Sequence, residues 1–205
     1  MTISELAEVT SGLHVSPSEP NAEGYKALTK PITYLQLSDF NNDGQKIPDK
    51  PPTYLHAAPQ QALKRLLEPG QVLLPSKGAR FISAAILEEW LPALASPSFF
   101  VLTLRNPEIC LPEFLALILN LPETREELRA RIRTTTIPTL NRGDLLEMPL
   151  LSGPATAIPY WPTIRQQKQA VELHSLWLKE KDLAKRYLQT REQFIYNFIT
   201  NSIKP

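Results

Sequence analysis

The stretch "PYWPTIRQQKQAVELHSLWLKE", residues 159–180, decides the fold because the proline and glycine content of the chain changes within it. Every proline except the terminal Pro205 lies at or before Pro162, and all seven glycines precede it. Proline and glycine are the strongest breakers of regular structure. The sequence therefore predicts a turn-rich body over residues 1–162, followed over 163–205 by one long helix with Thr163 as its N-cap.

The C-terminal segment carries an apolar stripe at helical spacings of three, four and seven residues. The stripe consists of Leu173, Leu176, Leu183, Tyr187, Phe194 and Phe198. About 40 residues in a helix span about 60 Å, too long to pack wholly on a body of this size. Glu180 and the Thr190-Arg191 pair interrupt the stripe, so we expect imperfect pairing. The stripe predicts an interface for a partner helix, in a homodimer or on another subunit.

The preceding body is predicted to be a mixed α/β (α+β) domain of short strands and helices. Strands are expected at 32–40, as a pair around a Ser-Lys-Gly turn within 70–87, and at 98–105. A helix should open at Pro112, with Leu115, Ile118 and Leu119 facing inward, and should break at Pro122 before a second, charged helix. Residues Asn141–Asp144 predict a turn before a last strand.

Composition limits the classes of function. The 205 residues are 42% hydrophobic, and 22 Lys+Arg against 21 Asp+Glu give a net charge of +1. This balance excludes a polybasic coat, so any nucleic-acid contact must come from a local patch. The single cysteine, Cys110, excludes an internal disulfide and suits a reducing compartment. Without a signal peptide or a long apolar run, the sequence predicts a soluble, cytoplasmic protein and no membrane contact.

Three groups of side chains are candidate DNA contacts. A binding loop is expected at 20–31, a cationic hairpin tip at 76–80, and a phosphate site after the second helix, past its acidic residues. The candidates are Lys26 and Lys30; Ser76, Lys77 and Arg80; and Arg131, Arg133 and Thr134. Each group also has a plain structural interpretation: a connecting loop, a solvated hairpin tip, or arginines paired with glutamates within a helix.

Catalytic patterns are missing from the sequence. It contains no Gly-rich phosphate loop, no nucleophile elbow, no paired histidines and no paired cysteines. The "FNNDGQ" segment lacks the alternating ligands of a calcium loop. We therefore expect no catalytic residue, no metal and no cofactor. An enzyme that uses His56 or Cys110 is a remaining alternative, although a buried, inert thiol is favoured for Cys110.

The serial order of four segments resembles the target recognition domain of type I restriction-modification specificity subunits. "LEPGQVLLPSKGARF" (67–81) resembles that family's glycine-containing hairpin, and "SFFVLTLRN" with "LPEFLALILN" its strand followed by a helix. "TTTIPTLNRGDLLEMPLL" (134–151) resembles the segment before the long conserved helix, which "PYWPTIRQQKQAVELHSLWLKE" enters. The resemblance spans residues 5–200. The chain departs from it at Gln71, where an acid is usual, at Thr134-Thr135, and in the inserted segment 152–160.

The resemblance implies sequence-specific recognition of double-stranded DNA by a non-catalytic subunit. Its partner would be a methyltransferase subunit that uses S-adenosylmethionine, and a restriction or translocase subunit is a further one. The family typically carries two recognition domains and two conserved helices, whereas this sequence shows one of each. It therefore resembles a half-subunit, which either pairs as a homodimer through its helix or works as a single reader. The alternative function is a helix-mediated scaffold or adaptor without DNA binding.

Overall fold

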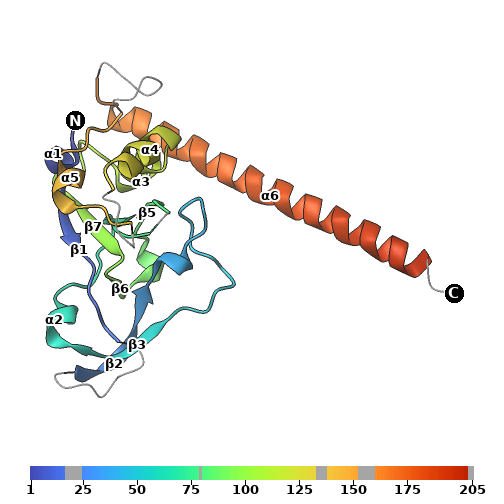
Figure 1. Ribbon diagram of the computed structural model, residues 1–205, viewed down its shortest axis with the longest axis horizontal. Helices are drawn as coiled ribbons and strands as arrows, with labels where there is room; N and C mark the ends of the chain where they lie inside the picture. The colour runs from blue at the N-terminus through green and yellow to red at the C-terminus, as the bar shows by residue number, and fades with distance from the viewer. Residues whose placement is uncertain (17–24, 79, 133–137, 152–159, 203–205) are drawn as a thin grey trace. The chain divides into compact units, whose positions relative to one another are not determined.

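The computed structural model describes residues 1–16, 25–78, 80–132, 138–151 and 160–202 (Figure 1). The chain divides into two compact units, Met1–Lys168 and Gln169–Pro205. The first unit combines short strands with short helices, and the second is formed by the continuation of one long helix. The predicted class, a mixed α/β body followed by a long C-terminal helix, is confirmed.

One antiparallel sheet runs through the body in the order β1-β7-β4-β5. Its strands are β1 (Ala7–Ser11), β7 (Phe99–Leu104), β4 (Val72–Pro75) and β5 (Ala84–Ala85). All four residues of β4 are buried, and Val72 pairs with Ala85 on one side and with Leu102 on the other. A strand covered on both faces has no need for polar alternation, which explains its continuous apolar run. The strand pair predicted within 70–87 and the strand predicted at 98–105 are both present.

A second sheet has the order β3-β2-β6. It consists of β3 (Tyr54–Pro59), β2 (Tyr25–Leu35) and β6 (Ala93–Ala95), with β2 antiparallel to β3 and parallel to β6. The strand predicted at 32–40 thus begins earlier and ends at Leu35. It ends there because the amide of Gln36 donates to Asp39 Oδ2 at 2.7 Å, which starts the 3-10 turn Leu37–Asp39.

Aromatic side chains fill the core of the body. Phe40 packs edge-on against Trp90 and Phe99, with ring centroids 5.6 and 5.9 Å away. Such edge-to-face pairs stabilise beyond the area they bury. The cluster therefore fixes the chain directly after the 3-10 turn against the sheet, and this position matters for the candidate site.

Helices cover the body as the proline signals predict. Helix α3 (Pro112–Leu119) begins at Pro112 and buries Leu115, Ile118 and Leu119, and α4 (Pro122–Ala130) begins at Pro122. Proline suits the first helical position because the amide that it lacks would have no helical partner there. Further short helical elements are α1 (Ile3–Leu6), α2 (Gln60–Leu63) and the 3-10 turn Glu88–Trp90.

The prediction for residues 141–151 was wrong. The Asn141–Asp144 segment is the start of a short helix, α5 (Arg142–Leu146), rather than a turn before a strand. Asn141 caps this helix because its Oδ1 accepts the amide of Gly143 at 2.9 Å. In the described residues after α5, β-pairing consists of one isolated bridge between Thr2 and Pro149, so the predicted strand does not form.

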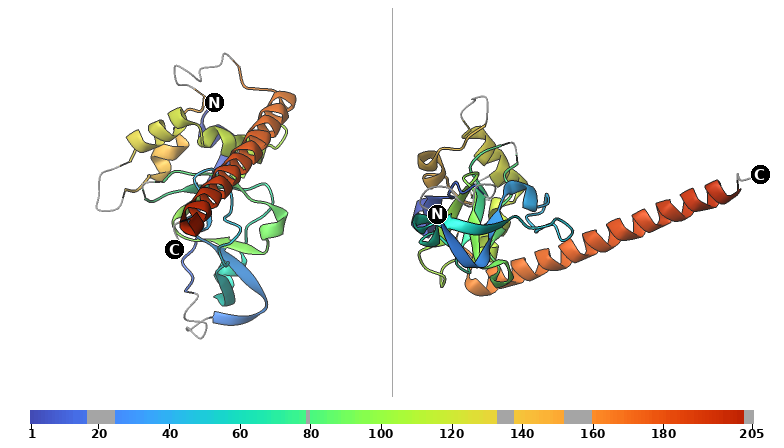
Figure 2. Two further views of the ribbon diagram at one scale, coloured as in Figure 1. Left: turned by 90° about the vertical axis from the view of Figure 1, so that its right-hand side faces the viewer. Right: turned by 90° about the horizontal axis from the view of Figure 1, so that it is seen from below.

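The long helix α6 (Ile164–Ser202) is uninterrupted, as predicted (Figures 1 and 2). Its start is a reciprocal cap: the Thr163 amide donates to Gln166 Oε1 at 2.9 Å, and the Gln166 amide donates back to Thr163 Oγ1 at 3.4 Å. Within the described ranges, no helix combines the length and apolar composition needed to span a membrane.

Candidate nucleic-acid interface

The connection between β4 and β5 places Lys77 and Arg80 on the surface of the body. Gly78 has a φ of +96°, a left-handed conformation that glycine adopts without strain, and its amide donates to Pro138 O at 2.9 Å. Lys77 forms a bridge with Thr139. The segment is therefore held by residues 138–139, while its two cationic side chains remain exposed.

Ser76 does not belong to this exposed surface. Its side chain is buried, and its Oγ donates to Pro97 O at 3.2 Å. Its backbone amide donates to Ser98 O, and its carbonyl accepts from the Leu140 amide. The predicted exposed tip began at Ser76, but exposure begins at Lys77. The segments around Ser98 and Leu140 both cover Ser76. We therefore remove Ser76 from the candidate contacts.

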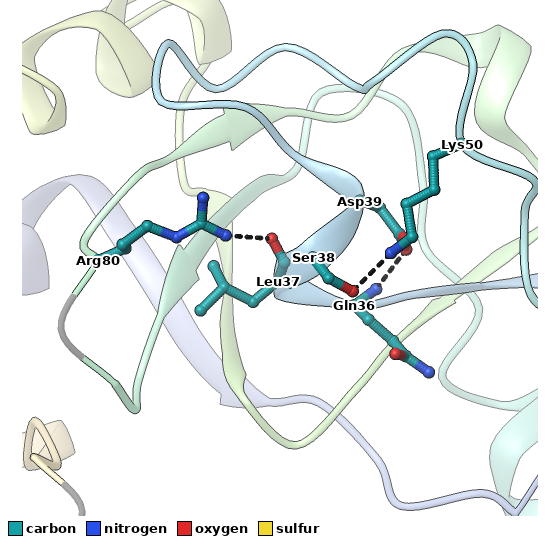
Figure 3. Close-up of polar contacts among 6 residues, drawn as sticks. All are labelled: Gln36, Leu37, Ser38, Asp39, Lys50 and Arg80. Atoms are coloured by element: carbon teal, nitrogen blue, oxygen red, sulfur yellow. Dashed lines mark hydrogen bonds and ion pairs between the residues drawn. The ribbon is translucent and has the colours of Figure 1, made fainter.

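Arg80 contacts the segment that follows β2 (Figure 3). Its Nη2 donates to Leu37 O at 3.1 Å. Its Nη1 also donates to Asn42 Oδ1, a residue outside this view, at 3.4 Å. A guanidinium has five N–H donors, so Arg80 keeps further donors for a ligand.

The 3-10 turn that supplies Leu37 O is itself braced. Lys50 Nζ lies 2.5 Å from Ser38 Oγ and 2.5 Å from Asp39 Oδ1, and Asp39 is buried (Figure 3). A largely desolvated ion pair of this kind fixes geometry more than it adds stability. The brace therefore holds the acceptor of Arg80 in place.

A tight turn at residues 41–45 presents an exposed amide, Asn42. Asn41 Oδ1 accepts the amides of Asp43 and Gln45 at 2.9 and 3.0 Å, an Asx-type turn. Gly44 has a φ of +79°, and a Cβ built on it would lie 2.3 Å from the carbonyl oxygen of Ser83. The turn is therefore pressed against the chain just before β5, with Asn42 at its outer side.

A second arginine, Arg125 of α4, reaches Asn42 from another direction. Its Nη2 lies 3.3 Å from Asn42 O and 3.3 Å from Asn120 Oδ1. Its Nε is buried and has no hydrogen-bond partner among the described residues. Burial lowers the pKa of Arg125, nearby Arg129 lowers it further, and Asp43 opposes both effects. Two guanidinium groups thus flank the exposed Asn42, and we call Arg80, Asn42 and Arg125 the Asn42 cluster.

Sequence reasoning missed two members of this cluster. Asn42 and Arg125 are not among the candidate contacts named from the sequence. The sequence "NNDG" (41–44) is typical of a turn, and residues 41–45 form one. However, the sequence does not reveal that residues 80, 42 and 125 meet, because this depends on the packing of α4 beside the β4–β5 connection.

Arg131 lies past the acidic residues in the sequence, but its side chain pairs with one of them in the structure. Its Nε and Nη2 donate to Glu127 Oε1 at 3.0 and 2.7 Å, and its Nη1 donates to Asp144 O at 3.3 Å. One turn of helix separates Glu127 from Arg131, so the two side chains lie on the same face. This pairing leaves Arg131 fewer donors for a phosphate, and its contact with DNA stays a prediction. Arg133 and Thr134 lie outside the described residues.

Lys26 and Lys30 lie on β2, so the loop predicted at 20–31 is a strand from Tyr25 onward, whereas residues 20–24 lie outside the described part. Both lysines are exposed. The register of β2 against β3 shifts between Ala27 and Ile32, as in a β-bulge. Such irregular strands often redirect side chains at functional surfaces.

The two residues of the enzyme alternative do not form a reactive site. Cys110 is fully buried, and burial raises the pKa of its thiol from 9.0 to about 12, so the thiol is protonated near neutral pH. The thiolate is the nucleophilic form, which makes Cys110 inert. His56 is exposed on β3. The described residues hold no group of three His, Cys, Asp or Glu that could bind a metal ion.

The start of α6 is fixed by a buried glutamine, Gln167, which sequence reasoning also missed. Its Oε1 accepts the Leu111 amide at 2.8 Å, and its Nε2 donates to Ile109 O and Pro162 O, each at 2.8 Å. Trp161 Nε1 also donates to Ile109 O. A glutamine in the first turn, five residues after Pro162, was the only signal available in the sequence.

The predicted partner-interface residues are exposed on α6. The exposed fractions are Leu173 68%, Leu176 56%, Leu183 65%, Tyr187 58%, Phe194 71% and Phe198 66%. Large apolar side chains rarely stay in contact with water in such number on one face. The exposure agrees with an interface but does not identify its partner.

Comparison with solved structures shows what this fold is similar to. The chain matches the S subunit of a type I restriction-modification system from M. genitalium, with 15% identity, a TM-score of 0.54, and coverage of 94% of this chain and 42% of the other. It matches the HsdS subunit from Thermoanaerobacter tengcongensis with 19% identity, a TM-score of 0.61 and coverage of 98% and 47%. The fold is that of these S subunits.

A third match comes from a structural study of assembly and conformational transition in the type I R-M system. Its chain has 15% identity, a TM-score of 0.57, and coverage of 97% of this chain and 42% of the other. The present chain thus spans less than half the length of the S subunits it matches. No protein-family model and no curated protein matches the sequence.

One departure from the S-subunit motifs now has a structural explanation. Gln71 stands where an acid is usual, and its Oε1 accepts the Glu68 amide at 3.0 Å while its Nε2 donates to Thr103 Oγ1 at 3.0 Å. The acceptor role is one that a carboxylate could also fill, whereas the donor role requires the amide. The departures at Thr134-Thr135 and within 152–159 lie outside the described residues.

Proposed function

We propose that this chain reads DNA sequence as a non-catalytic specificity component of a restriction-modification or related phage-defence system. The observation that carries the proposal is the Asn42 cluster, an exposed amide between two guanidiniums, on a body with the S-subunit fold. Amides and guanidiniums are the side chains that recognise base edges most specifically. The role requires no cofactor and no reactive group on this chain.

Within this proposal, base contacts and phosphate contacts come from different residues. Asn42 can pair with the edge of an adenine, and either arginine with a guanine or a phosphate. Lys77 sits beside the cluster on the same β4–β5 connection and suits a phosphate. Lys26 and Lys30 would extend the contact along β2, and Arg133 and Thr134 stay in the proposed set on the sequence argument alone.

The charge balance makes this a local contact. Because the whole chain carries a net charge of +1, DNA must be attracted by the few cations near Asn42 rather than by the whole surface. Asp43 lies close enough to Arg125 to act on its pKa, so one acidic side chain belongs to the neighbourhood. The affinity for DNA that lacks the recognised sequence should therefore be modest.

In this proposal the C-terminal helix mediates assembly. We propose residues 1–162 as the recognition domain and 163–205 as the helix for dimerisation or for docking a methyltransferase subunit, with a restriction or translocase subunit as a further partner. The exposed apolar residues of α6 support this division of roles. Such a complex would act on DNA in the cytoplasm.

A salt titration of DNA binding tests the proposal. Fluorescence anisotropy with a mixed-sequence duplex should show an affinity that falls as salt rises. Changing Lys77 and Arg80 together to alanine should reduce the slope of log K against log salt by about two units if both meet phosphate. If Arg80 reads a guanine, the loss should instead be about 1–3 kcal/mol on the cognate site.

The matched control is the double change of Lys64 and Arg65 to alanine. These two residues are also exposed and adjacent, and they carry the same charge, but they follow α2, away from the Asn42 cluster. Their replacement should leave affinity and slope nearly unchanged. Equal losses of affinity in both double variants would mean that the DNA site is not at the β4–β5 connection. If wild-type protein shows no salt-sensitive DNA binding, a scaffold role is favoured instead.

A further inference from the structure

Asn120 lies between α3 and α4 and contacts three other parts of the body. Its Oδ1 accepts the Ser83 amide and its Nδ2 donates to Ser83 O, each at 2.8 Å. A Cβ built on Gly44 would lie 3.2 Å from its Nδ2, so the turn at residues 41–45 packs directly on it. The same Oδ1 also accepts Arg125 Nη2 at 3.3 Å. Asn120 therefore connects the chain before β5, the turn and α4.

Arg125 continues this connection to Asn42. Its Nη2 donates to Asn120 Oδ1 and to Asn42 O, both at 3.3 Å, so both N–H groups of this nitrogen are used within the protein. A guanidinium offers two donors side by side only as the pair Nε and Nη2 or the pair Nη1 and Nη2. Each pair includes Nη2. Arg125 therefore has no free pair of donors for the O6 and N7 atoms of a guanine.

The buried Nε of Arg125 indicates how firmly this position is imposed. It has no hydrogen-bond partner among the described residues. A buried donor without a partner is costly, and such groups are rare in folded proteins. A guanidinium that was free to turn would expose this donor to water, so the contacts of Nη2 must outweigh the missing one. The side chain of Arg125 is thus held as a link between Asn120 and the backbone of Asn42.

We propose that Arg125 and its anchor Asn120 are positioning residues for DNA recognition, which hold Asn42 in place to read a base without contacting DNA themselves. Asn42 is the exposed member of this series of contacts, and its Oδ1 accepts from Arg80. Its backbone is thus fixed by Arg125 and its side-chain amide by Arg80. The inference rests on the function proposed above for the Asn42 cluster. In it, Arg125 contacts neither guanine nor phosphate.

An asparagine that reads a base needs this support. It binds adenine through two hydrogen bonds, one made by Oδ1 and one by Nδ2, so its amide must match the edge of the base. Such sites must be held to within about 0.5 Å of the productive geometry. The bond from Arg80 still leaves Asn42 a second lone pair on Oδ1 and both hydrogens on Nδ2. Loss of positioning should therefore reduce sequence specificity and leave the attraction to phosphates unchanged.

Competition binding on the full chain tests the proposal with two duplexes, one selected by wild-type protein from a random library and one of scrambled sequence. Arg125→Gln removes the Nη2 donors, and Asn120→Ala removes the anchor. Each should lower the ratio of the two affinities about tenfold or more, while the slope of log K against log salt stays as in wild type. Arg129→Gln is the control: Arg129 is exposed on the same helix, its replacement removes the same charge, and the ratio should not change.

A double-mutant cycle with Asn42→Ala separates positioning from direct reading of a base. If Arg125 acts through Asn42, its replacement should cause no further loss of specificity in a protein that already lacks the Asn42 amide. The double variant Asn42→Ala with Arg125→Gln should therefore match Asn42→Ala within about twofold. Thermal unfolding followed by circular dichroism identifies a purely structural role, which would lower stability and the affinity for both duplexes together.

Each alternative result would overturn the positioning role. Losses of specificity that multiply in the double variant would mean that Arg125 reads a base of its own. A salt slope lower by about one unit in Arg125→Gln, but not in Arg129→Gln, would mean that Arg125 meets a phosphate. Equal losses of affinity for both duplexes would mean a structural role. If Asn120→Ala does not fold, Arg125→Gln and the cycle still decide. These results leave the proposed function in place, whereas wild-type protein without a preferred duplex would contradict the proposed function itself.

Discussion

Replacing Gln167 with alanine is expected to lower the free energy of unfolding by about 2–4 kcal/mol. The side chain is fully buried and satisfies the Leu111 amide and the Pro162 carbonyl. Alanine would remove the hydrogen-bond partner of both backbone groups, and each such loss costs about 1–3 kcal/mol where water cannot replace the partner. Ile109 O keeps the hydrogen bond from Trp161, so it should contribute little.

The control for this change is Gln169→Ala in the same helix. Gln169 is exposed, and its replacement should alter the free energy by no more than about 0.5 kcal/mol. Urea denaturation followed by circular dichroism measures both variants. If the two variants unfold at the same urea concentration, Gln167 does not fix the start of α6, and the anchoring role assigned to it is wrong.

Gly44→Ala should have a comparable effect on the body and a larger one on recognition. Gly44 has a φ of +79°, and its new Cβ would lie 2.3 Å from the Ser83 carbonyl oxygen, so the backbone of the turn must move. We expect a loss of about 2–4 kcal/mol from conformational strain and the lost contact. Because Asn42 sits on the same turn, sequence-specific DNA binding should fall while the salt-dependent, non-specific part remains.

Gly143→Ala is the matched control. The nearest atom to a Cβ at Gly143 is Asn141 Oδ1 at 3.7 Å, an ordinary contact, and the residue lies within α5. The change should be neutral or stabilising by about 0.4–1 kcal/mol. Thermal unfolding and competition binding compare the two variants. Wild-type stability and specificity in Gly44→Ala would mean that the turn is not rigidly placed.

Sequence reasoning succeeded where the signal is local. Pro112 and Pro122 each start a helix, and the Thr163 cap with an uninterrupted apolar periodicity specifies α6, because these effects act within a few residues. The buried Leu115 and Leu119 follow from the same periodicity. Local rules therefore predicted the architecture and the position of the exposed stripe on α6.

The failures lie where a residue suits more than one local role, or where distant segments meet. Asn141 was interpreted as a turn residue, but its side chain caps α5, and both roles suit asparagine. Ser76 is buried because the segments around Ser98 and Leu140 cover it. Arg131 pairs with Glu127, and the Asn42 cluster forms between three distant segments. The Asn141 cap and the Arg131–Glu127 pair are local contacts that the sequence allows but does not single out. The burial of Ser76 and the Asn42 cluster depend on tertiary packing and have no sequence signal.

The central claim is that this protein recognises a DNA sequence, and selection of bound duplexes from a random library tests it most directly. We expect enrichment of two identical half-sites in inverted orientation, because the proposed dimerisation through the C-terminal helix would relate the two bodies by a two-fold axis. Their gap should be constant and shorter than about 18 base pairs, the length of a helix of about 60 Å. Enrichment of a single ungapped, asymmetric site would contradict the pairing. Recovery of no preferred sequence at any salt concentration would contradict the claim itself.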